Sequence, residues 1–199
     1  MKLFKKFGKK EQGFITVVSG LPRSGTSLMM KMLEAGGIPP MTDNIRTADD
    51  DNPKGYYEYE RAKKLREGDT AWLPDSQGKA VKIIAALLTH LPSDYEYRVL
   101  FMRRKIDEVL ASQTKMLENR GEETKVDDET MKDLFNKHLK QVRGWMNSQP
   151  NLLYLDLDYN AMLANPDPYI RQINQFLGGN LDEEKMLAVI DKSLYRQRQ

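Results

Sequence analysis

The sequence predicts an α/β fold in which a central, mostly parallel sheet is flanked by helices in three layers. Short apolar runs rich in β-branched residues alternate along the chain with stretches of helical periodicity. A glycine-bounded loop follows the first apolar run and opens the first helical stretch. In such folds the ligand site lies beyond the carboxyl ends of the strands, so polar residues that follow the strands are the first candidates for function.

Four apolar runs predict the strands. The run over residues 80–84 is the weakest, and the others cover residues 14–18, 97–102 and 152–157.

Apolar residues at helical spacing separate these runs. The first helix follows the glycine-bounded loop and ends at Gly36-Gly37. A second stripe covers residues 106–117, and a long helix is predicted over residues 127–146. The last helix begins at Asn165-Pro166 and ends at Gly178-Gly179. The resulting order is βαβα.

Length and charge limit the classes of protein to consider. The 199 residues, 40% of them hydrophobic, suffice for one domain, expected over residues 13–199 after a basic, flexible N-terminus at residues 1–12. A net charge of +2 disfavours nucleic-acid binding. The lysines of the N-terminus suggest at most weak peripheral membrane contact. Because no run resembles a membrane span or a signal peptide and cysteine is absent, we expect a cytoplasmic protein.

The loop over residues 19–27 is predicted to cradle an anion. Gly20 and Gly25 permit tight turns, and the amides that follow lie where a helix N-terminus presents unpaired N–H groups. Hydroxyl groups add further donors. The predicted phosphate ligands are Arg23, Ser24, Gly25, Thr26 and Ser27.

The spacing Gly20-x4-Gly25-x-Ser27 overlaps the Walker A pattern of P-loop proteins, but Thr26 occupies the position of the usual lysine. An ordinary NTPase is therefore disfavoured. The cation is instead Arg23, inside the loop. With this displaced cation, residues 22–27 resemble the 5′-phosphosulfate loop of sulfotransferases that use 3′-phosphoadenosine 5′-phosphosulfate (PAPS). The resemblance implies a P-loop NTPase-like fold.

A second element strengthens the resemblance. Arg104 follows the third predicted strand, and Ser112 lies eight positions later on the next helix. This spacing resembles the sulfotransferase element that holds the 3′-phosphate of PAPS, with Glu108 at an acidic position often found between the two. Arg103 is the alternative arginine. A nucleotide with phosphates on both the 3′ and 5′ carbons needs two separated anion sites, and the sequence offers two.

Residues 52–60 resemble the Asn-Pro-x-Gly-aromatic-aromatic-Glu stretch of bacterial sulfotransferase-like proteins. Glu58 is the candidate general base, since tyrosines on both sides would desolvate its carboxylate and raise its pKa. The alternative is a carboxylate that opens a helix and is stabilised by the helix dipole.

Other ionisable residues are weaker candidates. Arg196 lies in a late basic segment that is loosely similar to a phosphate clamp of the family, or else belongs to a solvated tail. His90 and His138 are disfavoured as bases, because one ends a predicted helix and the other lies among charged residues. Lys79 and Lys82 are expected at the surface. No residues at metal-ligand spacing suggest a metal site, and PAPS lacks the phosphate pair that Mg²⁺ usually bridges.

The resemblance therefore implies a PAPS-dependent sulfotransferase that needs no metal. It would transfer a sulfuryl group to a hydroxyl or amine acceptor and release adenosine 3′,5′-bisphosphate (PAP), with Glu58 and Arg23 in catalysis. The acceptor class stays open among small molecules, glycans, lipids and peptides. The alternatives are a P-loop kinase or NTPase with an atypical loop, for which Asp156 and Asp158 are possible metal ligands, and a non-catalytic nucleotide-binding module.

Overall fold

The fold is built on one parallel sheet. The computed structural model describes residues 13–43, 57–119, 121–122 and 126–190. Within them the strand order is β2-β1-β3-β4, with all neighbours parallel. The strands are β1 (Ile15–Gly20), β2 (Ala80–Lys82), β3 (Tyr97–Arg103) and β4 (Leu152–Asp158). The predicted fold class is confirmed, and β2 ends two residues earlier than the sequence suggested.

The central strand brings the predicted site residues to one edge. All six residues of β1 are buried, and Ile15, Val17 and Val18 among them give the strand its apolar character in the sequence. Val18 pairs with Lys82 on one side and with Leu100 on the other. Because the strands are parallel, the loop after β1 lies between the segments that follow β2 and β3.

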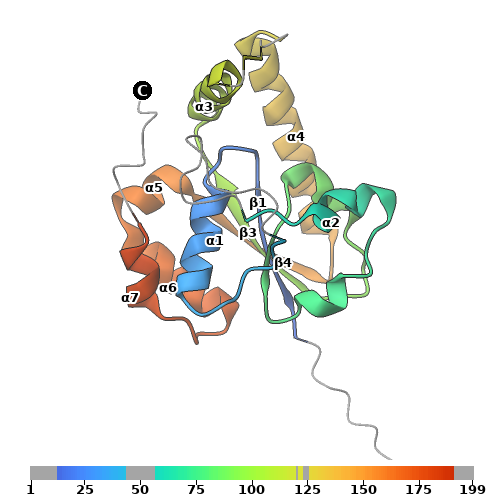
Figure 1. The fold of residues 1–199 in the computed structure, drawn as a ribbon, viewed down its shortest axis with the longest axis vertical. Helices are drawn as coiled ribbons and strands as arrows, with labels where there is room; N and C mark the ends of the chain where they lie inside the picture. The colour runs from blue at the N-terminus through green and yellow to red at the C-terminus, as the bar shows by residue number, and fades with distance from the viewer. Residues whose placement is uncertain (1–12, 44–56, 120, 123–125, 191–199) are drawn as a thin grey trace, which may run out of the picture.

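Helices cover both faces of the sheet (Figure 1). One face carries α1 (Thr26–Ala35), α5 (Tyr159–Ala164), α6 (Pro166–Leu177) and α7 (Glu183–Ala188). The other face carries α2 (Glu60–Lys63), α4 (Asp128–Ser148) and three 3₁₀ turns, η1 (Lys64–Glu67), η2 (Leu73–Ser76) and η3 (Ala85–His90). Each face of the sheet has its own hydrophobic core, and alternate strand residues point into one or the other. Val99 and Phe101 pack on the side of α4, whereas Leu100 and Met102 pack on the side of α1.

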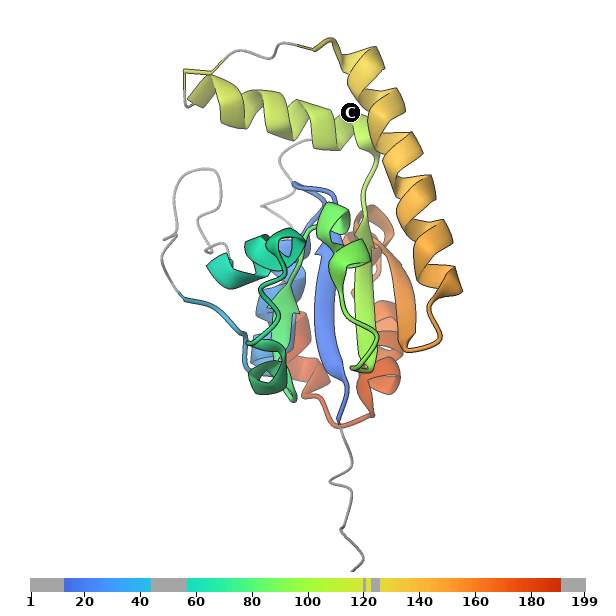
Figure 2. The same ribbon diagram turned by 90° about the vertical axis from the view of Figure 1, so that its right-hand side faces the viewer.

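The remaining helix, α3 (Ile106–Asn119), crosses above the carboxyl edge of the sheet, next to the upper part of α4 (Figure 2). The predicted long helices are confirmed. The side chain of Asp127 caps α4 by accepting a hydrogen bond of 2.9 Å from the amide of Thr130. At α6, Pro166 opens the helix, and Gly178 closes it with φ 113°.

Three sequence predictions fall wholly or partly outside the described residues: the basic N-terminus at 1–12, the first part of the motif over residues 52–60, and Arg196. Among the helices that are described, none is long and apolar enough to cross a membrane.

Candidate active site

The loop after β1 is held by close contacts at its two glycines. A Cβ atom on Gly20 would lie 2.6 Å from the carbonyl oxygen of Met102, and one on Gly25 would lie 2.3 Å from Cδ2 of Tyr159. Both glycines also have positive φ, 151° and 96°. A side chain at either position would displace the loop from the strand and helix that support it.

Ser24 forms hydrogen bonds within the loop. Its hydroxyl and its amide both donate to the carbonyl of Leu21, at 2.7 and 3.2 Å, and the residue is buried. The side chain therefore closes the turn of the loop. The amides of the first turn of α1, which begins at Thr26, remain the predicted anion donors.

Arg23 connects the loop to α3. Its backbone is left-handed, with φ 68°, which costs a residue with a side chain about 1–2 kcal/mol. Its Nε atom donates to Oγ of Ser112 at 2.9 Å, and its carbonyl accepts from Nη1 of Arg104 at 3.2 Å. The structure thus joins Arg23, Arg104 and Ser112 in one cluster, where the sequence had suggested two separated sites.

A buried carboxylate fixes Arg104. Its Nε atom donates to Glu108 at 2.8 Å, and the two side chains are 8% and 1% exposed. The second oxygen of Glu108 accepts from Nδ2 of Asn160, also at 2.8 Å. Glu108 therefore orients the guanidinium through a charge-assisted hydrogen bond.

The guanidinium of Arg104 lies over the ring of Tyr159, 5.1 Å from its centroid. Burial raises the pKa of the Tyr159 hydroxyl, the cation of Arg104 opposes that rise, and Glu108 adds to it. The same ring packs against Gly25. Tyr159 and Asn160 were not singled out from the sequence, although they directly follow β4, at the edge where the site was expected.

Arg103 and Arg104 turn to opposite faces of the sheet. Nε of Arg103 donates to Oδ1 of Asp156 at 2.6 Å, and Arg143 of α4 pairs with the other oxygen of that carboxylate. Arg104 instead reaches Tyr159 on α5. Only Arg104 of the two contacts the loop residue Arg23 in the described hydrogen bonds.

Glu58 lies near the end of β2. Its Oε1 atom is 4.0 Å from Nζ of Lys82, and its Oε2 atom is 2.8 Å from Nζ of Lys63. The hydroxyl of Thr42 donates to its carbonyl at 2.9 Å. Helix α2 begins two residues later, at Glu60, so Glu58 does not open the helix as the alternative interpretation required. The segment 44–56, which includes much of the motif around it, lies outside the described residues.

The surface position predicted for Lys82 is wrong. Its side chain is only 11% exposed, because it ends β2 and turns toward Glu58. Since Lys82 pairs with Val18, two residues before Gly20, the Glu58–Lys82 pair lies beside the glycine loop. His90, by contrast, is exposed at the end of η3. In the part of the chain that the structure describes, no three potential metal ligands form a group.

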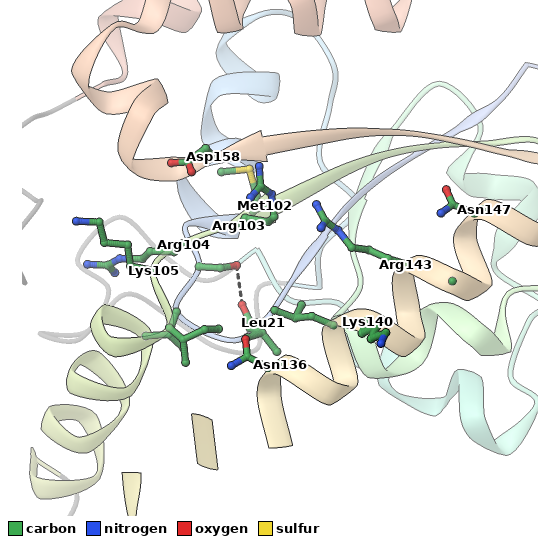
Figure 3. Close-up of a pocket in the computed structure, with 15 residues that line it drawn as sticks. Leu21, Met102, Arg103, Arg104, Lys105, Asn136, Lys140, Arg143, Asn147 and Asp158 are labelled. Atoms are coloured by element: carbon green, nitrogen blue, oxygen red, sulfur yellow. Dashed lines mark hydrogen bonds between the residues drawn. The ribbon is translucent and has the colours of Figure 1, made fainter. Parts of the chain in front are cut away.

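A pocket of about 640 Å³ opens between this edge of the sheet and α4. Figure 3 shows Arg103, Arg104 and Lys105 at the end of β3, and Asn136, Lys140, Arg143 and Asn147 along α4. Leu21 and Ser24 of the glycine loop also line it. The pocket therefore adjoins the predicted anion cradle. Arg143, Lys140 and Asn136 are functional candidates that the sequence analysis missed, since they appeared as ordinary polar positions of a long helix.

Comparison with known proteins identifies the family. The sulfotransferase domain family matches residues 15–199. The chain belongs to the sulfotransferase family. No sequence among the curated proteins matches this sulfotransferase-family chain significantly.

Solved sulfotransferases share its fold at low sequence identity. The sulfotransferase domain of the Synechococcus PCC 7002 olefin synthase has 16% identity and a TM-score of 0.54, covering 99% of this chain and 85% of its own. The sulfotransferase STF1 of Mycobacterium tuberculosis H37Rv has 14% identity and a TM-score of 0.58, and the match covers 89% of this chain and 70% of STF1. The sulfotransferase domain of the curacin biosynthetic pathway has 13% identity and a TM-score of 0.53, and the match covers 90% of this chain and 78% of that domain. At these identities the likeness concerns the fold.

Proposed function

We propose that this protein transfers the sulfuryl group of PAPS to a hydroxyl or amine acceptor and releases PAP. Family membership supports sulfuryl transfer in general. The observation that carries the choice of donor is the cluster of Arg23, Arg104 and Ser112 beside the glycine loop. It puts a serine and two arginines beside the half-buried N-terminus of α1, so the proposed sites of the 5′-phosphosulfate and the 3′-phosphate adjoin each other in one basic cluster.

Each group has a distinct proposed task. The amides of the first turn of α1, together with Arg23, hold the 5′-phosphosulfate and stabilise charge on the leaving phosphate. Arg104 holds the 3′-phosphate, in an orientation fixed by Glu108. Ser112 accepts its hydrogen bond from Arg23, so its own hydroxyl proton is left to donate to that phosphate. Arg196 stays a predicted ligand from the sequence.

The proposed chemistry lies at the end of β2, beside the loop. The oxygen or nitrogen of the acceptor attacks sulfur, and Glu58 accepts the proton that this atom loses. The bond from sulfur to the bridging phosphate oxygen breaks. Lys82, whose ammonium group is 4.0 Å from the Glu58 carboxylate, is placed to stabilise negative charge on the transferred group. The reaction needs no metal in this scheme, since alignment and fixed cations do the work.

Nucleotide binding tests the donor. Thermal unfolding is measured with PAP, ADP and adenosine 5′-phosphosulfate, each with and without Mg²⁺. We expect PAP to stabilise the protein without Mg²⁺, by about 2.7 kcal/mol at a hundred times its dissociation constant. Stabilisation by ADP alone, and only with Mg²⁺, would refute the proposal in favour of a kinase or NTPase. PAP binding without transfer to any acceptor in a broad panel would indicate a non-catalytic nucleotide-binding module.

Two neighbouring arginines provide a matched control. Arg104→Ala removes a charged donor and should weaken PAP binding about tenfold or more, with a smaller effect on adenosine 5′-phosphosulfate. Arg103→Ala, one residue away on the opposite face, should leave PAP binding nearly unchanged. Equal losses in both variants would contradict the assignment of the 3′-phosphate to Arg104. Arg23→Ala should weaken both nucleotides.

Glu58→Gln tests the base. It should lower turnover by about 10²–10⁴-fold and leave PAP affinity intact. Glu60→Gln is the control, because Glu60 also pairs with Lys63 but lies farther along the chain, in α2. Retained turnover in Glu58→Gln would place the base elsewhere.

A further inference from the structure

The pocket beside α4 carries more positive charge than its carboxylates balance. Five basic side chains line it, together with one acidic side chain, Asp158. Asp158 is occupied as the cap of α5, where it accepts from the amide of Ala161. The five basic residues are Arg103, Arg104, Lys105, Lys140 and Arg143.

Only the three arginines have acidic partners. Arg104 pairs with Glu108, and Arg103 and Arg143 share Asp156. Lys105 and Lys140 make no ion pair with any described residue and are exposed. They are therefore the uncompensated charges of the pocket, and an anion would gain from both.

The polar residues of α4 share one stripe of the helix. Asn136, Lys140, Arg143 and Asn147 are spaced by four, three and four positions, so they lie on one face and line the pocket together. Figure 3 shows Arg143 extending from this face toward the end of β3. Apolar side chains complete the wall: Leu21, Met102, Ile106, Val109 and Leu139. A ligand with an apolar body and an anionic group matches this lining.

The pocket borders the proposed nucleotide contacts at Arg104, which lines it, and extends from there along α4. Arg104 turns to Tyr159 on α5, whereas Arg103 and Arg143 meet at Asp156 on the side of α4. Yet Leu21 and Ser24 belong to the glycine loop, so a molecule in the pocket would adjoin the bound donor. The volume of about 640 Å³ is that of a small-molecule site.

We infer that this pocket binds the sulfuryl acceptor and that the acceptor carries an anionic group, a phosphate, sulfate or carboxylate, in addition to the hydroxyl or amine that is modified. The inference rests on the proposed function, because it assigns the acceptor side of the same site. Lys140 and Lys105 select the anion, and the apolar wall holds the body of the molecule.

The test is binding of phenyl phosphate and of phenol, a pair that differs only in the phosphate, to the full chain saturated with PAP. Binding is measured by titration calorimetry. We expect phenyl phosphate to bind at least about tenfold tighter than phenol and to weaken as salt is raised. Phenyl sulfate and benzoate distinguish which anion is preferred. Failure of PAP itself to bind would count against the proposed function, whereas the comparison of the two phenyl compounds concerns the pocket alone.

Lysine variants identify the site. Lys140→Gln should weaken phenyl phosphate about fivefold, as expected for one exposed charge, and leave PAP affinity unchanged. Lys137→Gln is the matched control, since it removes the same charge from the same helix outside the pocket lining. Lys105→Gln provides a second pocket variant.

Several results would overturn the inference. They are equal binding of phenol and phenyl phosphate, no phenyl phosphate binding at 10 mM, displacement of phenyl phosphate by PAP, and equal losses in Lys137→Gln and Lys140→Gln. Displacement by PAP would mean that the pocket belongs to the nucleotide site.

Discussion

Replacing Gly25 by alanine should destabilise the protein through two separable effects. The new methyl group would lie 2.3 and 2.6 Å from ring carbons of Tyr159, well inside van der Waals contact. The residue would also have to keep φ 96°, which only glycine adopts readily. Because Tyr159 is buried under Arg104, its ring has little space to move away.

The two costs are estimated separately. A left-handed backbone costs a residue with a side chain about 1–2 kcal/mol, and an extra methyl group in a packed site costs about 1–3 kcal/mol. Gly25→Ala should therefore lower the free energy of unfolding by about 2–5 kcal/mol. Gly37→Ala isolates the backbone cost, since Gly37 has a similar φ of 104° and a Cβ there would meet nothing within 4 Å. It should lose only about 1–2 kcal/mol.

Urea unfolding followed by tryptophan fluorescence measures these differences, since the chain has two tryptophans. A double variant with Tyr159→Leu should relieve the clash, so Gly25→Ala and Tyr159→Leu together should cost about 1–3 kcal/mol less than the sum of the single variants. The reasoning is refuted if the two substitutions are additive, or if Gly25→Ala costs no more than Gly37→Ala.

Three further predictions concern charge. Glu108→Gln should weaken PAP binding about tenfold and lower the free energy of unfolding by about 2–3 kcal/mol, because Arg104 loses a buried carboxylate; calorimetry and urea unfolding measure both, and unchanged PAP affinity would show that Glu108 does not position Arg104. Burial raises the pKa of Tyr159, so its share of stability is complete below its unfolded pKa near 10 and falls as pH rises further; urea unfolding between pH 8 and 11 should show a smaller decline in Tyr159→Phe than in the wild type, and identical declines would contradict this. Hydrogen bonds from Thr130 lower the pKa of Asp127, so the capping contribution to α4 persists above its unfolded pKa near 3.9 and is lost as pH falls; circular dichroism should show Asp127→Ala less helical at pH 7 than Asp128→Ala and a smaller acid-induced loss, whereas equal behaviour would exclude the cap.

The sheet could be predicted because its signals are local. Burial of β1 leaves a mostly apolar run around Ile15, Val17 and Val18, and residues such as Pro166 and Gly178 mark helix ends in the sequence itself. The 3₁₀ turns η1 and η2 had no comparable signal, and for η3 only its end at His90 was recognised, since these short segments show little apolar spacing. Helix α7, six residues long, was missed for the same reason.

The long-range contacts at the site could not be predicted from the sequence. The spacing of Arg104 and Ser112 indicated that they share an element, but the bond from Arg23 joins residues 89 positions apart. Lys82 looked like a surface lysine, because a three-residue strand gives too short a pattern to show which way its last side chain turns. The ring of Tyr159 on Gly25 likewise depends on how β4 ends against the loop.

Because Arg103 and Arg104 point in opposite directions, the register of β3 matters for function. Strand side chains alternate, so one residue inserted between Tyr97 and Met102 would exchange the two arginines between the faces of the sheet. Arg104, which now lies over Tyr159, would point toward Asp156, and Arg103 would point toward Tyr159. Such an insertion would keep every residue of the site but would turn Arg104 away from the proposed nucleotide site and Arg103 away from the pocket. Among homologues, the length of this strand should therefore vary less than the identity of the residues within it.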